Sequence, residues 1–409
     1  MIALRPILSS LSRNKVGAAL IALQMAVTLA ILCNAVYIIQ QRMARAARPS
    51  GIDEADDFAI ANQWIGTAAA DAGALIQADV AALRAIPAVA DAYITNSFPF
   101  DGGGATTQIT LHPDQPRSRR TTTVYLGDQH AMDTLGFRLS AGRNFNASDI
   151  RDFRSPLKLP PINGMLVTRA LAEQLAPAGK VLGRVATLVS LPVSAPIVGV
   201  IDTLQAPNVN APGGNAVAYN SVVLPYRVGT PGAAYVVRAK PGGLAQAMKA
   251  APAALARVSR QRVITDEFSL AEERRAAYSG DRTLALMLTL VCLILLAVTA
   301  FGIVGLTSYW VSQRRRQIGI RRALGATRGA IMQHFQTENL LITAGGIVVG
   351  VVLAVAGNLW IVKSFAMGRL PYEYLLVGVV ALLVLGQLAA LWPALRAASV
   401  PPAVATRNV

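Results

Sequence analysis

The side chains with the most evident binding potential are six arginines between Arg314 and Arg328, which no acidic residue accompanies. Arginine stays protonated and binds carboxylates and phosphates through several N–H donors. The segment therefore suits either an anchor beside anionic lipids or a surface that binds a partner protein. Residues 317–324 predict a short amphipathic helix that Gly325 ends, and Thr327 can cap the helix that follows.

Catalytic and metal-binding side chains are few. Between residues 42 and 282 the histidines are His112 and His130, and no spacing of Cys or Glu makes either one a metal ligand. Cys33 and Cys292 both fall in apolar stretches, so we interpret them as small apolar helix residues. The sequence thus predicts no catalytic residue, no metal and no cofactor on this chain.

Composition and charge distribution indicate a membrane protein. Hydrophobic residues make up 53% of the 409 residues and charged residues 15%, with a net charge of +16 and a mean hydropathy of +0.44. Residues 42–282 carry 25 Lys/Arg against 20 Asp/Glu, whereas segments 1–15, 314–328 and 396–409 carry basic residues and no acid. Because basic residues are retained on the cytoplasmic side, this asymmetry indicates topology and not nucleic-acid binding.

Four uncharged stretches are long enough to cross a bilayer, which needs about 20 apolar residues. We predict spanning helices at 16–39, 283–310, 339–362 and 374–395. The first is too long for a cleaved secretory signal. The remaining segments are a cytoplasmic N-terminus (1–15), a periplasmic domain with a stalk (40–282), a cytoplasmic elbow (311–338), a periplasmic turn (363–373) and a cytoplasmic tail (396–409). Arg42, Arg45 and Arg48 conflict with this topology, because they place three basic residues at the far end of the first span.

The predicted fold class is a four-helix membrane protein with a large α+β domain inserted between helices 1 and 2. Strands and helices alternate irregularly in that domain. Predicted helices are 78–86, 169–175 and 244–258, and predicted strands are 89–98, 109–111, 121–126, 165–168, 222–224, 235–238 and a region at 188–201 broken by Pro192 and Pro196. An exposed loop is expected at 206–215. A Ser-x-x-Glu capping box at Ser269 is expected to begin one unbroken helix over 270–310, about 60 Å long.

Polar and small residues in the spans predict helix packing. Gln24 and Thr28 lie about 40° apart on the first helix, and polar side chains in a span usually face protein, although contact with a substrate is an alternative. In the third span, small residues recur at every fourth position and let another helix approach closely. Packing within one subunit and a subunit interface both explain this stripe, which consists of Gly346, Gly350, Ala354 and Asn358.

The elbow also carries a family resemblance. Residues 316–328, RQIGIRRALGATR, resemble the most specific motif of FtsX-like ABC-transporter permeases of the macrolide-exporter (MacB) type, which usually has Glu where Gln317 stands. Weaker similarities to the same family cover nearly the whole chain. They lie at 135–137, 141–145, 166–175, 182–183, 197–201, 393–398 and 401–402.

The resemblance implies a permease that works as a homo- or heterodimer in the bacterial inner membrane, with its elbow docked on a separate ABC ATPase subunit. ATP is expected on that partner, because these 409 residues contain no Gly-x-x-x-x-Gly-Lys-Ser/Thr loop, and the chain itself is not expected to be an enzyme. The residues that match the motif, and that would contact the ATPase, are Gln317, Ile318, Gly319, Ile320, Arg321, Arg322, Ala323, Leu324, Gly325 and Thr327.

The same resemblance implies a mechanism and a function. Closure of the ATPases would move the elbows, and the second spanning helix would carry this motion to the periplasmic domain, which is type VII mechanotransmission. The expected function is export of amphiphiles such as antibiotics or peptides through a tripartite pump with a periplasmic adaptor and an outer-membrane duct. Lipoprotein release, and an FtsX-like scaffold that activates a cell-wall hydrolase, are the alternatives.

Overall fold

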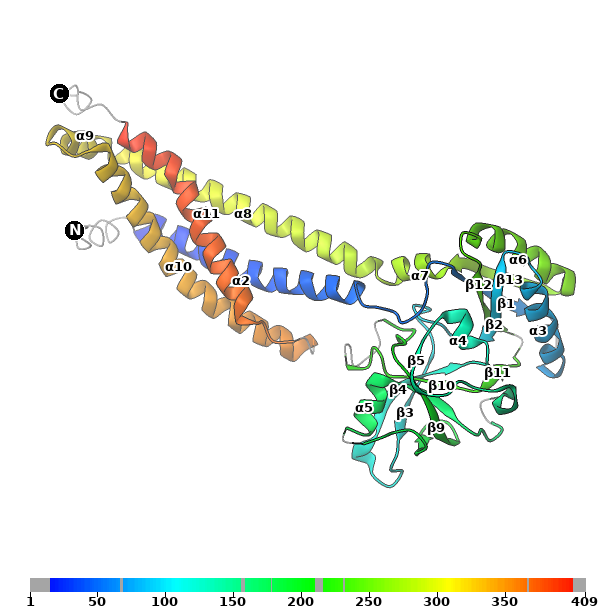
Figure 1. Ribbon diagram of the computed structural model, residues 1–409. Coiled ribbons are helices and arrows are strands. Elements are labelled where there is room, and N and C mark those ends of the chain that lie inside the picture. The colour runs from blue at the N-terminus through cyan, green and yellow to red at the C-terminus, as the bar shows by residue number, and fades with distance from the viewer. Residues whose placement is uncertain are drawn as a thin grey trace. The chain divides into compact units, whose positions relative to one another are not determined.

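The computed structural model describes residues 15–66, 69–155, 159–177, 179–209, 216–230, 232–365 and 368–399 (Figure 1). Most of the predicted N-terminal segment 1–15, the tail beyond residue 399 and most of the predicted loop 206–215 lie outside these residues. The chain divides into two compact units. We call Met1–Ala47 with Asp281–Val409 the helical unit, and Arg48–Gly280 the inserted unit.

The helical unit contains the membrane-length helices. They are α2 (Lys15–Ala46), α8 (Ser279–Gln313), α10 (Arg328–Phe365) and α11 (Tyr372–Ala398), and the short helix α9 (Arg315–Ala323) joins α8 to α10. In the described part of the chain, these four are the helices long and apolar enough to cross a membrane. The predicted fold class is therefore confirmed, whereas the ends of the spans within these helices stay predictions.

The four long helices pack around a narrow apolar core. In this unit α2 lies along α10, and α10 lies along α11 (Figure 1). Ile21, Met25 and Leu29 of α2 are fully buried there, together with Ile303 of α8 and Leu382 of α11. Large apolar side chains also cover the outside of the unit, such as Leu286 and Phe301, which are 72% and 75% exposed. A surface of this kind suits lipid, in which apolar side chains need no cover.

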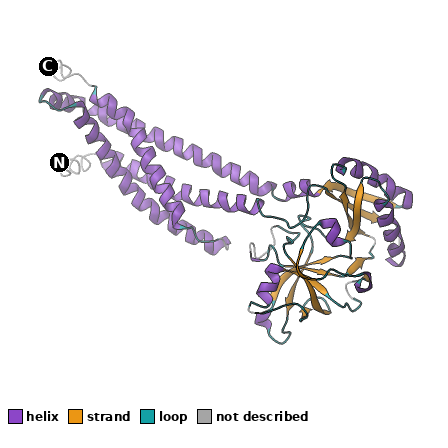
Figure 2. Cartoon of the chain, in the orientation of Figure 1, coloured by secondary structure: helices purple, strands orange, loops and turns teal. Residues whose placement is uncertain are grey.

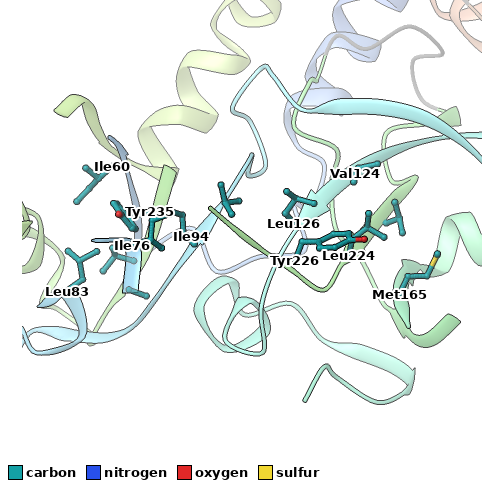
Figure 3. Close-up of a cluster of buried hydrophobic side chains, with 14 of the residues drawn as sticks. Ile60, Ile76, Leu83, Ile94, Val124, Leu126, Met165, Leu224, Tyr226 and Tyr235 are labelled. Atoms are coloured by element: carbon teal, nitrogen blue, oxygen red, sulfur yellow. The ribbon is translucent and has the colours of Figure 1, made fainter. Parts of the chain in front are cut away.

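The first lobe of the inserted unit is a four-stranded antiparallel sheet on which two helices pack (Figure 2). Its strand order is β13 (Arg262–Ser269), β1 (Asp57–Trp64), β12 (Gly232–Ala239) and β2 (Val89–Thr95), and its helices are α3 (Ala69–Arg84) and α6 (Leu244–Val258). Ile60, Ile94 and Tyr235 of the sheet share a buried cluster with Ile76 and Leu83 of α3 (Figure 3).

A buried ion pair also joins α3 to this sheet. The guanidinium group of Arg262 donates to both carboxylate oxygens of Asp79, at 2.7 and 2.8 Å, and the Tyr235 hydroxyl donates to the same carboxylate at 2.6 Å. Neither charged side chain is more than 4% exposed. Buried charges of this kind need a partner, so the pair fixes how α3 sits on the sheet.

The second lobe is a closed ring of six strands. The order is β9 (Val193–Ile201), β7 (Met165–Thr168), β10 (Ser221–Leu224), β4 (Arg120–Leu126), β3 (Ala105–Thr110) and β8 (Val185–Leu188), and β8 pairs back with β9. Closure follows from β9, whose residues 193–196 pair with β8 while residues 197–201 pair with β7. The remaining elements are β5 (Leu139–Gly142) beside β9, the pair β6 (Arg151–Phe153) and β11 (Tyr226–Val228), and the helices α4 (Ala131–Leu135), α5 (Arg169–Leu175), η1 (Pro116–Ser118) and η2 (Ala147–Asp149).

The structure corrects the prediction of one helix over 270–310. Helix α7 (Leu270–Ala277) ends at Tyr278, whose φ of −100° and ψ of 7° are not helical, and α8 then begins at Ser279. The Tyr278 ring is buried in the inserted unit, and the side-chain amide of Gln205 donates a hydrogen bond to its hydroxyl. Two shorter helices therefore replace the expected continuous stalk.

One expectation about strands was also wrong. Pro196 lies inside β9 and does not break it, because β9 changes its neighbour from β8 to β7 at that point. Strands β1 and β13, which pair with each other in the first lobe, were not predicted.

Candidate functional site: the arginine-rich elbow

Helix α9 is joined to α10 by a tight turn, which is defined by a left-handed glycine and two backbone hydrogen bonds. Gly325 has a φ of +94°, a left-handed conformation that glycine adopts without strain. Its N–H donates to the carbonyl oxygen of Arg322, and the N–H of Ala326 donates to that of Arg321. These two hydrogen bonds form a Schellman motif, which ends a helix. The Thr327 hydroxyl then accepts a hydrogen bond from the N–H of Ala330 and caps α10.

One face of α9 packs on the ends of the neighbouring helices. Ile318 and Gly319 are buried, and Ile318 belongs to an apolar cluster contributed by four helices. The other members of this cluster are Val311, Ile331, Phe335, Ala394 and Ala397. The elbow helix is therefore fixed to α8, α10 and α11 at this end of the helical unit, which we call the elbow end.

A buried ion pair adds to this attachment. Arg314, at the junction of α8 and α9, donates to both carboxylate oxygens of Glu338 on α10, at 3.2 and 3.1 Å. The Glu338 side chain is 3% exposed and that of Arg314 is 18% exposed. Sequence reasoning missed this pair, although Glu338 is the only acidic residue between Asp281 and Glu373. An acidic residue beside a predicted span is a signal for a nearby cationic partner.

The opposite face of α9 is exposed. Gln317, Ile320, Arg321 and Leu324 recur at spacings of three and four residues, which places them on one side of a helix. Leu324 is 83% exposed and Ile320 is 47% exposed. We call these four residues the elbow face. Among the other residues that match the motif, Ala323, Gly325 and Thr327 are exposed, whereas Arg322 is half-buried and takes part in another interaction.

The polar residues of α2 contact two different helices. The Gln24 side-chain amide donates to the carbonyl oxygen of Val298 at 3.0 Å, and the hydroxyls of Thr28 and Thr299 lie 2.8 Å apart. Both contacts join α2 to α8. The Asn34 side-chain amide instead donates to the carbonyl oxygen of Ala354 on α10, at 3.1 Å.

The small-residue stripe of α10 faces α2 of the same chain. A Cβ atom added at Gly346 would lie 2.5 Å from the carbonyl oxygen of Ala22, and one at Gly350 would lie 3.0 Å from the Ala26 Cα. Ala354 is fully buried, and the side-chain oxygen of Asn358 accepts a hydrogen bond from the N–H of Leu370. The stripe thus has a partner helix within the subunit.

Substitution of Gly346 is expected to weaken this packing. In Gly346→Ala the new Cβ meets backbone, which cannot swing aside, and overpacking of this kind costs about 1–3 kcal/mol. Gly345→Ala is the matched control, because no atom of the part of the chain that the structure describes lies within 4 Å of the corresponding Cβ. Thermal unfolding of the purified chain in detergent is expected to show a lower Tm for Gly346→Ala only. Equal midpoints for the two variants would contradict the close approach.

Four membrane-length helices, with an α+β domain inserted between the first two and an arginine-rich elbow between the second and third, define a multi-pass membrane protein whose inserted domain has its own core. A family model described as MacB-like periplasmic core domain matches residues 24–255, and one described as FtsX-like permease C-terminal matches residues 289–402. The first covers more than half of the chain. The chain therefore belongs to the MacB-like family of ABC transporter permeases, and is a bacterial inner-membrane protein.

Relatives with curated descriptions agree with this assignment. Proteins described as macrolide export ATP-binding/permease protein MacB are 29% identical over 229 residues in Chromobacterium violaceum and 38% identical over 86 residues in Neisseria meningitidis. These matches cover 54% and 21% of this chain, but 32% and 13% of the relatives. The chain thus matches a third or less of the length of each. The matching family models describe the permease and periplasmic regions and no ATPase domain.

Two solved structures resemble part of the chain. The periplasmic region of MacB from Actinobacillus actinomycetemcomitans aligns with a TM-score of 0.33 and 10% identity, covering 55% of this chain and 94% of that structure. The extracellular domain of the ABC-type transporter YknZ from Gram-positive bacteria aligns with a TM-score of 0.31 and 14% identity, covering 51% and 100%. The family assignment rests on the two family models.

Proposed function

We propose that this chain is the membrane subunit of an ATP-driven exporter and that a separate ABC ATPase binds the elbow face. The observation that supports this proposal is the two-sided character of α9. One side is fixed to the bundle by the Ile318 cluster and by the Arg314–Glu338 pair, and the other presents Ile320 and Leu324 beside Arg321 to solvent. Exposed apolar side chains next to a cation fit a partner groove with an acidic rim.

Orientation follows from the distribution of charge. Segments 1–15, 314–328 and 396–409 are basic and lack acids, so the elbow and both termini are assigned to the cytoplasmic side and the inserted unit to the periplasm. ATP hydrolysis in the cytoplasm then moves the elbow, and the attached helices carry the motion across the membrane. The substrates are amphiphiles such as antibiotics or peptides, in keeping with the names of the relatives, which refer to macrolide export. A second permease subunit, a periplasmic adaptor and an outer-membrane duct complete the pump.

The ATPase contact is tested by purifying the tagged chain from its own membranes in mild detergent and identifying its partners by mass spectrometry. The wild-type chain is expected to bring down an ABC ATPase and a periplasmic adaptor. Arg321→Glu places a like charge against the acidic rim, and we expect it to lower ATPase recovery about tenfold. Arg396→Glu is the matched control, because Arg396 is also exposed but lies on α11, where it stacks on Trp392.

The purification and one test on cells decide between the functions. Recovery of an ATPase with a cell-wall hydrolase and no adaptor would favour a signalling scaffold. Accumulation of lipoproteins in the inner membrane of cells lacking the chain would favour lipoprotein release. If the wild-type chain brings down no ATPase, the proposed function is wrong.

A further inference from the structure

Two of the three arginines that the charge asymmetry does not explain, Arg42 and Arg45 of α2, lie beside one acidic side chain. Asp281 lies in the first turn of α8, and its side chain is 8% exposed. Arg42 Nη1 donates to one of its carboxylate oxygens at 2.7 Å, and Arg45 Nε lies 3.8 Å from the other. Arg42 and Arg45 are three residues apart, so both project from the same side of α2. We call these three residues the clasp.

The clasp lies beside both places where the chain passes between its two units. The chain leaves the helical unit after Ala47, two residues beyond Arg45, and returns to it at Asp281 itself. These are the two covalent connections between the units. An ion pair within the helical unit thus joins the end of the outgoing helix to the start of the returning one.

Helix α8 is the least buried of the four long helices. Only 17% of its most apolar stretch is buried, against 39% for α2, 33% for α10 and 22% for α11. Its contacts with α2 occur at successive levels, from Trp310 beside Gly17 at the elbow end, through the Thr28–Thr299 hydrogen bond, to Asp281 with Arg42. The clasp is therefore a contact that holds α2 and α8 together next to the inserted unit.

From this geometry we infer that Asp281, Arg42 and Arg45 are positioning residues for the transmission of motion. The clasp makes α2 and α8 move as one body at the point where both connect to the inserted unit. Displacement of α8 that starts at the elbow then reaches the inserted unit through two connections instead of one. Without the clasp, α8 moves independently of α2, and ATP hydrolysis continues without productive movement of the inserted unit. This inference rests on the proposed exporter function, but the clasp itself is testable without it.

A merely local role for Asp281 makes a different prediction. An acid in the first turn also stabilises a helix through its dipole, and that effect does not need Arg42. Exchange of the two charges, Asp281→Arg with Arg42→Asp, restores an ion pair but places a cation at the helix N-terminus. Recovery of the wild-type behaviour in the exchanged variant would therefore show that the ion pair matters and not the helix dipole. Asp281→Glu is the conservative control.

The first measurement concerns the clasp alone. Spin labels are attached at Met43 and Leu286, which are 50% and 72% exposed, in the full chain in lipid nanodiscs, after replacement of Cys33 and Cys292 by alanine. The unaltered clasp is expected to give one narrow distance distribution between the labels. Asp281→Asn is expected to broaden it, while Asp281→Glu and the exchanged variant keep it narrow. An unchanged distribution in Asp281→Asn would overturn the inference.

The second measurement uses the complex with its ATPase. Asp281→Asn is expected to lower export of a macrolide about tenfold while ATP hydrolysis persists, and the exchanged variant is expected to recover export. Export at the wild-type rate by Asp281→Asn, or no recovery in a correctly inserted exchanged variant, would overturn the inference and leave the proposed function intact. If the wild-type chain itself shows no ATP-dependent export, the proposed function fails, and the distance measurement still decides whether the clasp exists.

Discussion

Export by a complex that carries Gly325→Pro is expected to fall at least tenfold, to the background of an ATPase-free membrane, while the permease still inserts. Proline fixes φ near −65°, whereas residue 325 requires +94°, and proline also removes the N–H that bonds to the carbonyl oxygen of Arg322. Proline inside a helix costs about 3 kcal/mol or more because it removes a hydrogen bond and its ring clashes with the backbone, and about 1.4 kcal/mol already corresponds to a factor of ten. The elbow face then no longer points in one direction.

Gly325→Asn is the matched control for this effect, because asparagine adopts the left-handed conformation far more readily than other side chains and keeps the N–H. Among the described residues, none has an atom within 4 Å of a Cβ placed at this position, so the added Cβ meets no obstacle there. The measurement is macrolide susceptibility of cells, together with the amount of permease in their membranes. Full resistance in cells with Gly325→Pro would show that the turn does not orient the elbow.

The second large effect is expected at Glu338. Glu338→Ala leaves Arg314 without its carboxylate partner in a mostly buried position. Breaking a buried ion pair costs about 3–5 kcal/mol, and we expect about 3 kcal/mol because the Arg314 side chain keeps 18% exposure. The Tm of the purified chain in detergent is therefore expected to fall well below that of the wild type.

The control for Glu338 is the double variant Arg314→Met with Glu338→Leu. Replacement of a buried ion pair by apolar residues of similar size is often neutral, so this variant is expected to unfold close to the wild-type temperature. A double-mutant cycle over the two positions measures their coupling. Additive effects of the two single substitutions would mean that the pair contributes nothing to the stability of the elbow.

Elements with a strong local pattern could be predicted from the sequence. The helices 169–175 and 244–258 and the strand 165–168 match α5, α6 and β7 residue for residue, because the strand is a short apolar run and the helices place apolar residues on one face. The strand β13 was missed because it lies at the edge of its sheet and contains Arg262, Asp266 and Glu267, so it lacks an apolar run. The break at Tyr278 was missed because its cause is tertiary, namely burial of the ring and its contact with Gln205.

The sequence indicated where the candidate site lies in the chain, but not which of its residues are buried and which are exposed. The motif marked all of residues 317–325 alike, whereas the structure buries Ile318 and Gly319 and exposes Ile320 and Leu324. Which side of a short helix is buried depends on its neighbours, and here these include Ala394 and Ala397 of α11, which are distant in the sequence. The role of the motif residues in binding an ATPase stays a prediction.

The order of the strands has a consequence for how the protein is made. The ring of six strands is complete within residues 105–224, whereas β1 pairs with β12 and β13, which follow it by more than 160 residues. In the proposed orientation β1 reaches the periplasm before both of its partner strands. Its pairing is complete only after β13, which ends at residue 269, has been translocated. The ring lobe is thus the first part able to fold. The four-stranded sheet forms later, when nearly the whole inserted unit has been translocated.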